Sequence, residues 1–113
     1  MKSLKELYRI GPGPSSSHTL GPQRACRLFQ KRYPMAHHYE VELYGSLSLT
    51  GKGHLTDAII METMKPKACL VFFKNKKDLK HPNTMRLIAF DEKNQEIGDM
   101  IVYSIGGGAI RVE

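Results

Sequence analysis

The stretch HYEVELYG, residues 38–45, alternates apolar and polar side chains from its second position onward. On an extended chain, Tyr39, Val41 and Leu43 point to one side, and the residues between them point to the other. A period of two residues predicts a strand that is half buried, with one face against a core. The elements on either side of this strand decide the fold class.

The segment before the strand, PQRACRLFQKRY at residues 22–33, has the spacing of a helix. Its apolar residues recur three and four positions apart and share one face, while the basic residues lie largely away from it. The residues on the apolar face are Ala25, Leu28 and Phe29. Pro22 suits a first helical turn, and Pro34 ends the helix.

The segment after the strand, LTDAIIMETM at residues 55–64, predicts a second helix that stops before Pro66. At helical spacing, one side of this helix carries Leu55, Ala58, Ile59 and Glu62. A further short helical turn is expected at residues 3–8, SLKELY, where a serine precedes a glutamate by three positions.

Three more strands are expected, at residues 68–73 (ACLVFF), 84–91 (TMRLIAFD) and 96–105 (EIGDMIVYSI). The turn EKNQ joins the last two, and three glycines interrupt the chain before the final AIRVE. The order of elements is helix, strand, helix and then several strands. This order predicts an α+β domain, with a mostly antiparallel sheet and the helices on one face. Residues 1–113 are expected to form a single domain.

The composition of the chain argues against some classes of partner. The 113 residues are 41% hydrophobic and 25% charged, which is enough for one modest core. The net charge of +6 could attract nucleic acid, but the charges are scattered, so no nucleic-acid partner is expected. The sequence lacks a signal peptide and any apolar run near the ~20 residues of a membrane span, so we expect no membrane partner.

The two cysteines, Cys26 and Cys69, are far apart and form no CxxC pair. Two such residues cannot bind a metal alone and are a weak basis for a disulfide scaffold. We therefore expect a reduced, cytoplasmic chain. Because the sequence stops just after an apolar segment, we also expect it to be a piece of a longer protein.

The first candidate site stretch is GPGPSSSHTLGP, residues 11–22, placed just before the first helix. The unpaired amides and the positive dipole at a helix N-terminus favour an anion. A carboxylate ligand could lie among those amides and the hydroxyls of Ser15, Ser16, Ser17 and Thr19. On its own, the stretch is more typical of one capping hydroxyl in a solvated loop.

The second stretch is TGKGHLTD, residues 50–57, at the start of the second helix. Gly51 and Gly53 permit backbone geometry that other residues resist, and they place His54 near the helix start. A neutral imidazole there could accept a proton. Taken alone, His54 is more simply a capping or merely exposed histidine.

The third stretch is HPNTM, residues 81–85, in which Asn83 either binds a ligand or makes a turn before the strand. The fourth is the triple glycine at residues 106–108. Glycines in such a position let two backbones, or a backbone and a ligand, come close together.

Taken together and in order, GPSSSHTLGPQRA, GSLSLTGKGHLTDAI, HPNTMRLIAFD and YSIGGG resemble the β domain of the iron–sulfur-dependent L-serine dehydratases. The resemblance runs from about residue 3 to the end of the chain. It implies a fold similar to an allosteric substrate-binding domain. It also implies conversion of L-serine to pyruvate and ammonia, a step in amino-acid degradation that can feed gluconeogenesis.

By this resemblance, the cofactor of the full enzyme is a [4Fe–4S] cluster whose ligands lie in a separate α domain or α subunit. The present chain would hold no metal, because cluster binding takes about four ligands, usually cysteines. His18 and His54 become the candidates for proton transfer, with the choice of base left open. Substrate binding is assigned to Ser15, Ser16, Ser17, Thr19, Gly51, Gly53 and Asn83. Cys26 stands where the family more often has alanine, and both cysteines are expected to be buried thiols.

The resemblance implies three partners: L-serine, the α domain or subunit, and further copies in a homo-oligomer. The isolated chain is expected to be inactive. A different class of function also fits the implied fold, namely a non-catalytic module that binds an amino acid for regulation.

Overall fold

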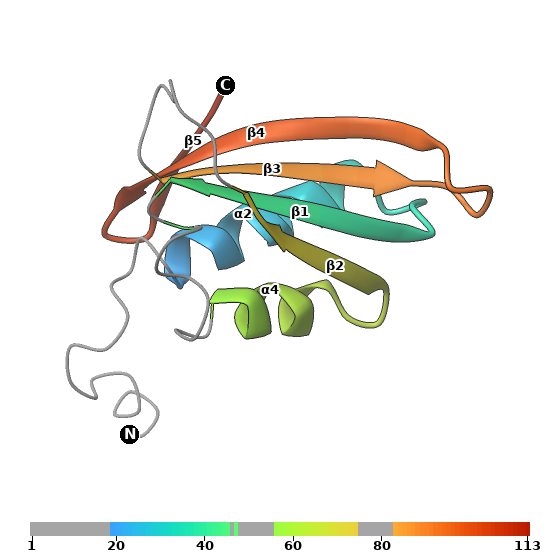
Figure 1. Cartoon of the computed structure of the whole chain (residues 1–113), viewed down its shortest axis with the longest axis horizontal. Helices are drawn as coiled ribbons and strands as arrows, with labels where there is room; N and C mark the ends of the chain where they lie inside the picture. Colours follow the sequence, from blue (N-terminus) through green and yellow to red (C-terminus); the bar gives the residue numbers. More distant parts are fainter. Residues whose placement is uncertain (1–18, 46, 48–55, 75–82) are drawn as a thin grey trace.

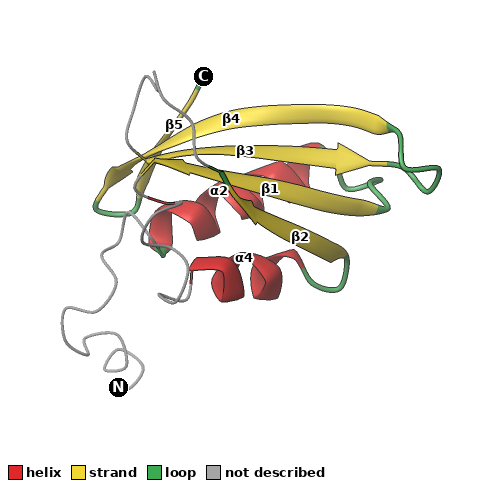
Figure 2. Ribbon diagram, in the orientation of Figure 1, coloured by secondary structure: helices red, strands yellow, loops and turns green. Residues whose placement is uncertain are grey.

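The computed structural model describes residues 19–45, 47, 56–74 and 83–113, shown in Figures 1 and 2. These residues form a sheet of five strands with two helices, an α+β arrangement as expected. The elements follow one another as α2 (Leu20–Arg32), β1 (His38–Gly45), α4 (Thr56–Met64), β2 (Ala68–Phe73), β3 (Asn83–Phe90), β4 (Glu96–Gly106) and β5 (Ala109–Val112). The helical turn expected at residues 3–8 lies outside the described residues.

The strands lie side by side in the order β2-β1-β3-β4-β5. β1 is parallel to β2, and every other neighbouring pair is antiparallel, so the sheet is mostly antiparallel as predicted. The parallel pair arises because the chain leaves β1, passes through α4 and re-enters the sheet in the same direction. A crossover through a helix is the usual way to join parallel strands.

The helices pack against one face of the sheet (Figure 2). The alternation in β1 is confirmed, because Tyr39, Val41 and Leu43 are almost fully buried. The neighbouring strands add side chains in matching register, such as Leu87 opposite Val41 and Met85 opposite Leu43. The core therefore lies between this face and the two helices.

The other face of the sheet is polar near its centre. There Arg86 forms ion pairs with Asp99 (3.0 Å), Glu96 (3.5 Å) and Glu42 (3.6 Å). Such partly exposed charges contribute little to stability pair by pair. They give this face charged groups that water can hydrate.

The first helix begins at Leu20, two residues before the predicted start. Pro22 fits inside the first turn because the first four amides of a helix have no partner within it. Ala25 and Phe29 are fully buried, as expected, and Leu28 is partly buried. Cys26 is also fully buried, which widens the apolar face.

The face expected for the second helix is wrong. The side chains that α4 buries are Thr56, Ile60 and Met64. Ala58 and Glu62 are exposed, and Leu55 lies outside the described residues. A helix with apolar residues on most sides can bury more than one face. Packing against α2 and β2 selects the face here. Neither described helix is long and apolar enough to cross a bilayer.

Candidate functional site

One end of the sheet brings together the described parts of all four glycine-punctuated stretches. β1 ends there at Gly45, which pairs with Asn83 at the start of β3. Because β4 runs antiparallel to β3, its glycine turn reaches the same end. Both helices begin on this side of the molecule (Figure 1). Stretches far apart in the sequence thus converge here.

One described contact at this end joins the glycine turn to α2. A Cβ atom at residue 108 would stand 3.3 Å from the Cβ atom of Leu20. Gly106, Gly107 and Gly108 all have positive φ angles, of 96°, 63° and 81°. The turn therefore offers backbone without side chains beside the start of a helix. Exposed peptide groups in such a place can approach a small ligand closely.

Thr19 immediately precedes α2. Its carbonyl accepts a 3.0 Å hydrogen bond from the amide of Gln23, but its hydroxyl makes no capping bond to the helix. The helix has no acidic residue in its first turn. Within its own first turn, α2 therefore carries no charge that offsets its dipole, which suits an anionic ligand.

Asn83 is part of β3, so the turn expected at this position is wrong. The residue pairs with Gly45 and belongs to the strand register that continues through Met85 on the core side. Its side-chain oxygen is buried. An amide group in this place is rigidly positioned by the sheet, which is what a ligand-binding amide requires.

Sequence reasoning missed two polar residues near this end. Ser104 on β4 and Thr56 at the start of α4 are both fully buried. Ser104 follows Met100 and Val102 on the core side of the strand, so a hydroxyl interrupts an otherwise apolar alternation. That interruption is visible in the sequence and could have identified Ser104. Thr56 gives no comparable signal, because threonine is common at helix starts.

Most of the predicted site residues lie outside the described residues. They are Ser15, Ser16, Ser17, His18, Gly51, Gly53 and His54. Their described neighbours are Thr19, which follows His18, and Thr56, two positions after His54. Of the predicted set, the structure therefore places Thr19 and Asn83.

Tyr44 on β1 is a partly buried titratable group near this end of the sheet. Tyr44 donates a 2.6 Å hydrogen bond to Glu42, and burial together with this carboxylate raises the pKa of Tyr44 to about 12. A tyrosine in this state cannot act as a base at neutral pH.

Cys26 and Cys69 are both buried and form no disulfide, as expected. Burial raises the pKa of Cys69 to about 12 and that of Cys26 well above its ordinary value. Metal binding requires thiolates, so neither thiol suits a cluster. Across residues 19–45, 47, 56–74 and 83–113, no three side chains of histidine, cysteine, aspartate or glutamate gather to bind a metal ion. The described residues do not fit a [4Fe–4S] cluster.

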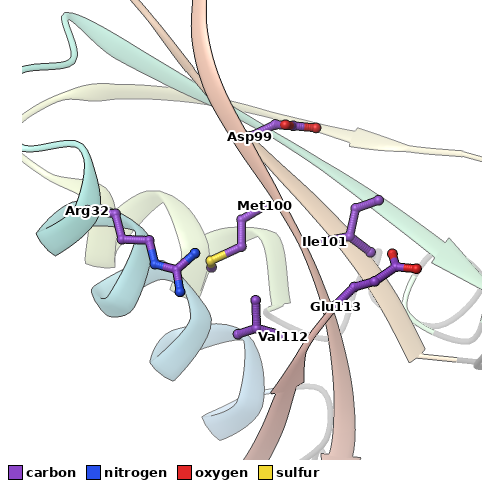
Figure 3. A pocket seen from close by; sticks show the side chains of 6 residues that line it. All are labelled: Arg32, Asp99, Met100, Ile101, Val112 and Glu113. Atoms are coloured by element: carbon purple, nitrogen blue, oxygen red, sulfur yellow. The ribbon is translucent and has the colours of Figure 1, made fainter.

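A pocket lies elsewhere on the molecule, where β5 stops and the edge of β4 is left open (Figure 3). Its lining is Arg32, Asp99, Met100, Ile101, Val112 and Glu113. Acidic groups of Asp99 and Glu113 share it with a single described cation, Arg32, so it offers no clear preference for an anion. None of the predicted site residues lines it.

Comparison with known proteins shows to which family the chain belongs. The profile of the serine dehydratase beta chain family matches residues 3–67 and 61–113, nearly the whole chain. This chain belongs to the serine dehydratase beta chain family. The family profile covers all four of the glycine-punctuated stretches whose described parts meet at one end of the sheet.

Relatives in this family are named as serine dehydratases. The L-serine dehydratase of Helicobacter pylori (strain J99) is 31% identical over 150 residues, an alignment that covers 98% of this chain and 33% of the relative. The L-serine dehydratase TdcG of Escherichia coli is 53% identical over 68 residues, covering 54% of this chain and 15% of the relative. The chain thus spans about a third of the length of the Helicobacter relative.

The alignment with the Helicobacter protein is longer than this chain. It extends over 150 residues, although the chain has 113, so the Helicobacter protein carries residues with no counterpart here. The two segments matched by the family profile overlap at residues 61–67. In the structure, this overlap covers the end of α4 and the residues Lys65, Pro66 and Lys67, which connect it to β2.

Proposed function

We propose that this serine dehydratase beta chain domain works within an L-serine ammonia-lyase, which converts L-serine to pyruvate and ammonia. One observation carries the proposal: the described parts of all four family stretches meet at one end of the sheet. That end combines two helix N-termini, a glycine turn and a strand-borne amide. Together these groups suit a small amino acid with a carboxylate.

The proposed binding residues divide by chemistry. Ser15, Ser16, Ser17 and Thr19 would donate hydroxyl and amide hydrogens to the carboxylate of serine. Gly51 and Gly53 would let the backbone approach the substrate, and Asn83 would orient it by hydrogen bonding. The support for this set is the position of Thr19 at the start of α2 and of Asn83 on the opposing sheet.

The proposed reaction needs a base for the α-proton of serine and an acid for its hydroxyl. His18 and His54 would carry these proton transfers, because imidazole titrates near neutral pH. Each would precede a helix that begins at the candidate site, since His18 adjoins Thr19 and His54 lies two positions before Thr56. Either histidine could be the base under this proposal.

The proposal places a [4Fe–4S] cluster in the remaining part of the enzyme, an α domain or α subunit. When bound there, the cluster would supply Lewis-acid chemistry to the substrate hydroxyl and carboxylate. The support for an external cluster is that the two described cysteines are buried, protonated thiols. The setting we propose is cytoplasmic amino-acid degradation, with pyruvate available for gluconeogenesis.

The test uses the whole enzyme that contains this chain. His18→Ala and His54→Ala should each lower kcat by roughly 10²–10⁴, the usual worth of a general acid or base. His37→Ala is the matched control, because His37 is exposed and adjoins β1 at the end opposite Gly45. Wild-type kcat/KM in both test variants would show that the site assignment is wrong.

A second experiment separates the proposal from a regulatory module. The isolated 113-residue chain should show no serine turnover and weak or no heat of serine binding in calorimetry. Tight serine binding by the isolated chain would instead favour a sensor of amino acids.

A further inference from the structure

Two adjacent histidines meet where β1 begins, at the end of the sheet opposite the candidate site. The Nδ1 atoms of His37 and His38 lie 3.0 Å apart. His38 pairs with Phe90 in the strand register, whereas Gly45 and Asn83 pair at the other end of the same two strands. At ~3.3 Å per residue, the eight residues of β1 separate the two ends by more than ~20 Å. The histidine pair therefore lies apart from the serine chemistry proposed above.

The hydrogen bonds of the neutral pair fix its tautomers. The Nε2 atom of His38 lies 2.9 Å from Oδ1 of Asn94, and an amide oxygen only accepts hydrogen bonds. Nε2 of His38 therefore carries the proton, and its Nδ1 presents a lone pair. His37 then donates its own Nδ1 proton to that lone pair. The ring of His37 is exposed, so its Nε2 faces solvent.

The ring of His38 is held in place by two contacts. It stacks on Phe90, with the ring planes 7° apart and the centroids 5.1 Å apart. Asn94 is itself fixed in the turn after β3, because it takes a positive φ of 64° and its amide donates a 3.0 Å hydrogen bond to the carbonyl of Asp91. In metal sites, a ligating histidine is oriented in the same way, by a hydrogen bond from its second ring nitrogen. His38 is thus positioned with Nδ1 as a ligand atom.

We propose that His37 and His38 bind one divalent transition-metal ion with tetragonal geometry, and that Cu²⁺ is the ion they bind most tightly. Both Nδ1 atoms would be ligands, with water in the remaining positions. His37 would pass its Nδ1 proton through water to Nε2, so that both rings stay neutral and each directs one lone pair at the metal. The amide of His37 already donates a 2.8 Å hydrogen bond to the carbonyl of Phe90, so only the exposed ring has to turn.

The spacing of the two nitrogens favours this geometry. With metal–imidazole bonds of about 2.0–2.1 Å, nitrogens 3.0 Å apart subtend an angle of about 90–100° at the metal. Neighbouring ligands make such an angle in the tetragonal sites of Cu²⁺ and Ni²⁺. A tetrahedral Zn²⁺ site would need the nitrogens ~3.3–3.4 Å apart. A given set of nitrogen ligands also binds Cu²⁺ more strongly than Ni²⁺ or Zn²⁺, which makes copper the expected ion.

This site is distinct from the [4Fe–4S] cluster that we place elsewhere in the enzyme. The expectation that the present chain holds no metal depended on the ligand count of a cluster, which takes about four protein ligands. A single ion completed by water needs fewer. The histidine pair supplies two, which agrees with the absence of larger groups of metal-binding side chains among the described residues.

Copper titration of the 113-residue chain tests the proposal. One Cu²⁺ should bind per chain, and pulsed electron paramagnetic resonance should detect the remote nitrogens of two imidazoles. Both native cysteines are buried, which keeps their thiols from competing for the ion. The sequence has five histidines, so a second chain keeps only the proposed pair. It carries the substitutions His18→Asn, His54→Asn and His81→Asn and should give the same spectrum.

Three further substitutions separate a built site from weak binding at exposed histidines. Asn94→Gly should lower the affinity for Cu²⁺ roughly 10–100-fold by releasing the ring of His38, while glycine keeps the positive φ of the turn. His38→Ala should lower it at least as much, because it removes a ligand. Gln95→Ala is the matched control. It removes an amide side chain from the same turn, in which Gln95 makes only backbone hydrogen bonds, and it should leave the affinity unchanged.

Failure to bind copper, an unchanged affinity in His38→Ala, or a signal from a single imidazole would each overturn the proposal. An affinity that Asn94→Gly leaves unchanged would overturn the positioning of His38 and reduce the pair to two exposed histidines. Circular dichroism of every variant checks that the fold is intact. The measurement needs no enzyme activity, so its outcome is independent of the proposed function.

Discussion

The backbone of Gly108 lies against the side chain of Leu20, so the β4–β5 turn and the start of α2 are packed together with no side chain between them. A Cβ atom at residue 108 would be 3.3 Å from the Leu20 Cβ atom and 3.7 Å from its Cδ1 atom. This contact joins two of the four family stretches. It also fixes where the glycine backbone stands relative to the helix N-terminus at the candidate site.

The loss of stability caused by a substitution in the glycine turn should therefore depend strongly on its position. Gly108→Ala adds a tight contact to a strained φ of 81° and should lower the free energy of unfolding by about 1–3 kcal/mol. Gly107→Asn should cost less, because asparagine tolerates a left-handed φ and a Cβ atom there meets nothing within 4 Å. Urea unfolding compares the two variants. Equal losses would argue against the contact with Leu20.

A second close approach joins Gly98 to Tyr33. A Cβ atom at residue 98 would come within 2.3 Å of the Tyr33 ring, which also packs against Phe29 at a centroid distance of 4.9 Å. Gly98→Ala should destabilise the chain by about 1–3 kcal/mol through overpacking. In a Tyr33→Ala background the same substitution should be nearly neutral or slightly stabilising, since alanine suits a strand better than glycine. A thermal double-mutant cycle without coupling would refute this explanation.

Two neighbouring lysines should differ in their contribution to stability. The ammonium of Lys67 donates hydrogen bonds to the carbonyl oxygens of Pro34 and Ala36 and lies 5.9 Å from the Tyr39 ring centroid. Lys67→Met would leave these carbonyls without their donor and should cost about 1–3 kcal/mol. Lys65→Met removes only an exposed pair with Glu62 and should cost less than about 1 kcal/mol. If urea unfolding ranks the two variants the other way, the bridging role of Lys67 is wrong.

Alkaline pH should destabilise the fold. Burial raises the pKa of Cys69 from 9.0 to about 12 and, with Glu42, that of Tyr44 from 10.0 to about 12. The unfolded chain therefore loses these protons first as the pH rises. Stability from these groups should be complete below about pH 9 and should fall progressively toward pH 12. Urea midpoints at several pH values measure this loss, which should be smaller in Cys69→Ala. A stability that stays constant or rises from pH 9 to pH 11 would contradict it.

Periodicity predicted the elements well where one face alone is buried. In β1, the alternation of Tyr39, Val41 and Leu43 with polar residues matched the observed burial. It failed for α4, where Ile59, Ile60 and Met61 are consecutive and several faces are apolar. Only contact with α2 and β2 chose the face of Ile60 and Met64.

Part of the candidate site was also predictable from local features of the sequence. Thr19 could be selected from its position before a helix, and Asn83 from its family stretch. Ser104 interrupts the apolar alternation of β4, a signal that is present in the sequence, but only the structure shows that its hydroxyl is buried near the candidate site. The turn interpretation of Asn83 was wrong because its pairing with Gly45 depends on a strand distant in the sequence.

By itself, the sequence determined the α+β class, the order of the elements from α2 to β4, the buried state of both cysteines and the family of the chain, whereas it did not predict β5. These depend on local spacing and on residue types in order along the chain. Tertiary structure alone decided that β1 lies between β2 and β3, that Gly108 meets Leu20 and that β2 forms an edge of the sheet. Such relationships arise from contacts between distant segments. Their energies depend on how all the elements fill one core, and no local pattern records them.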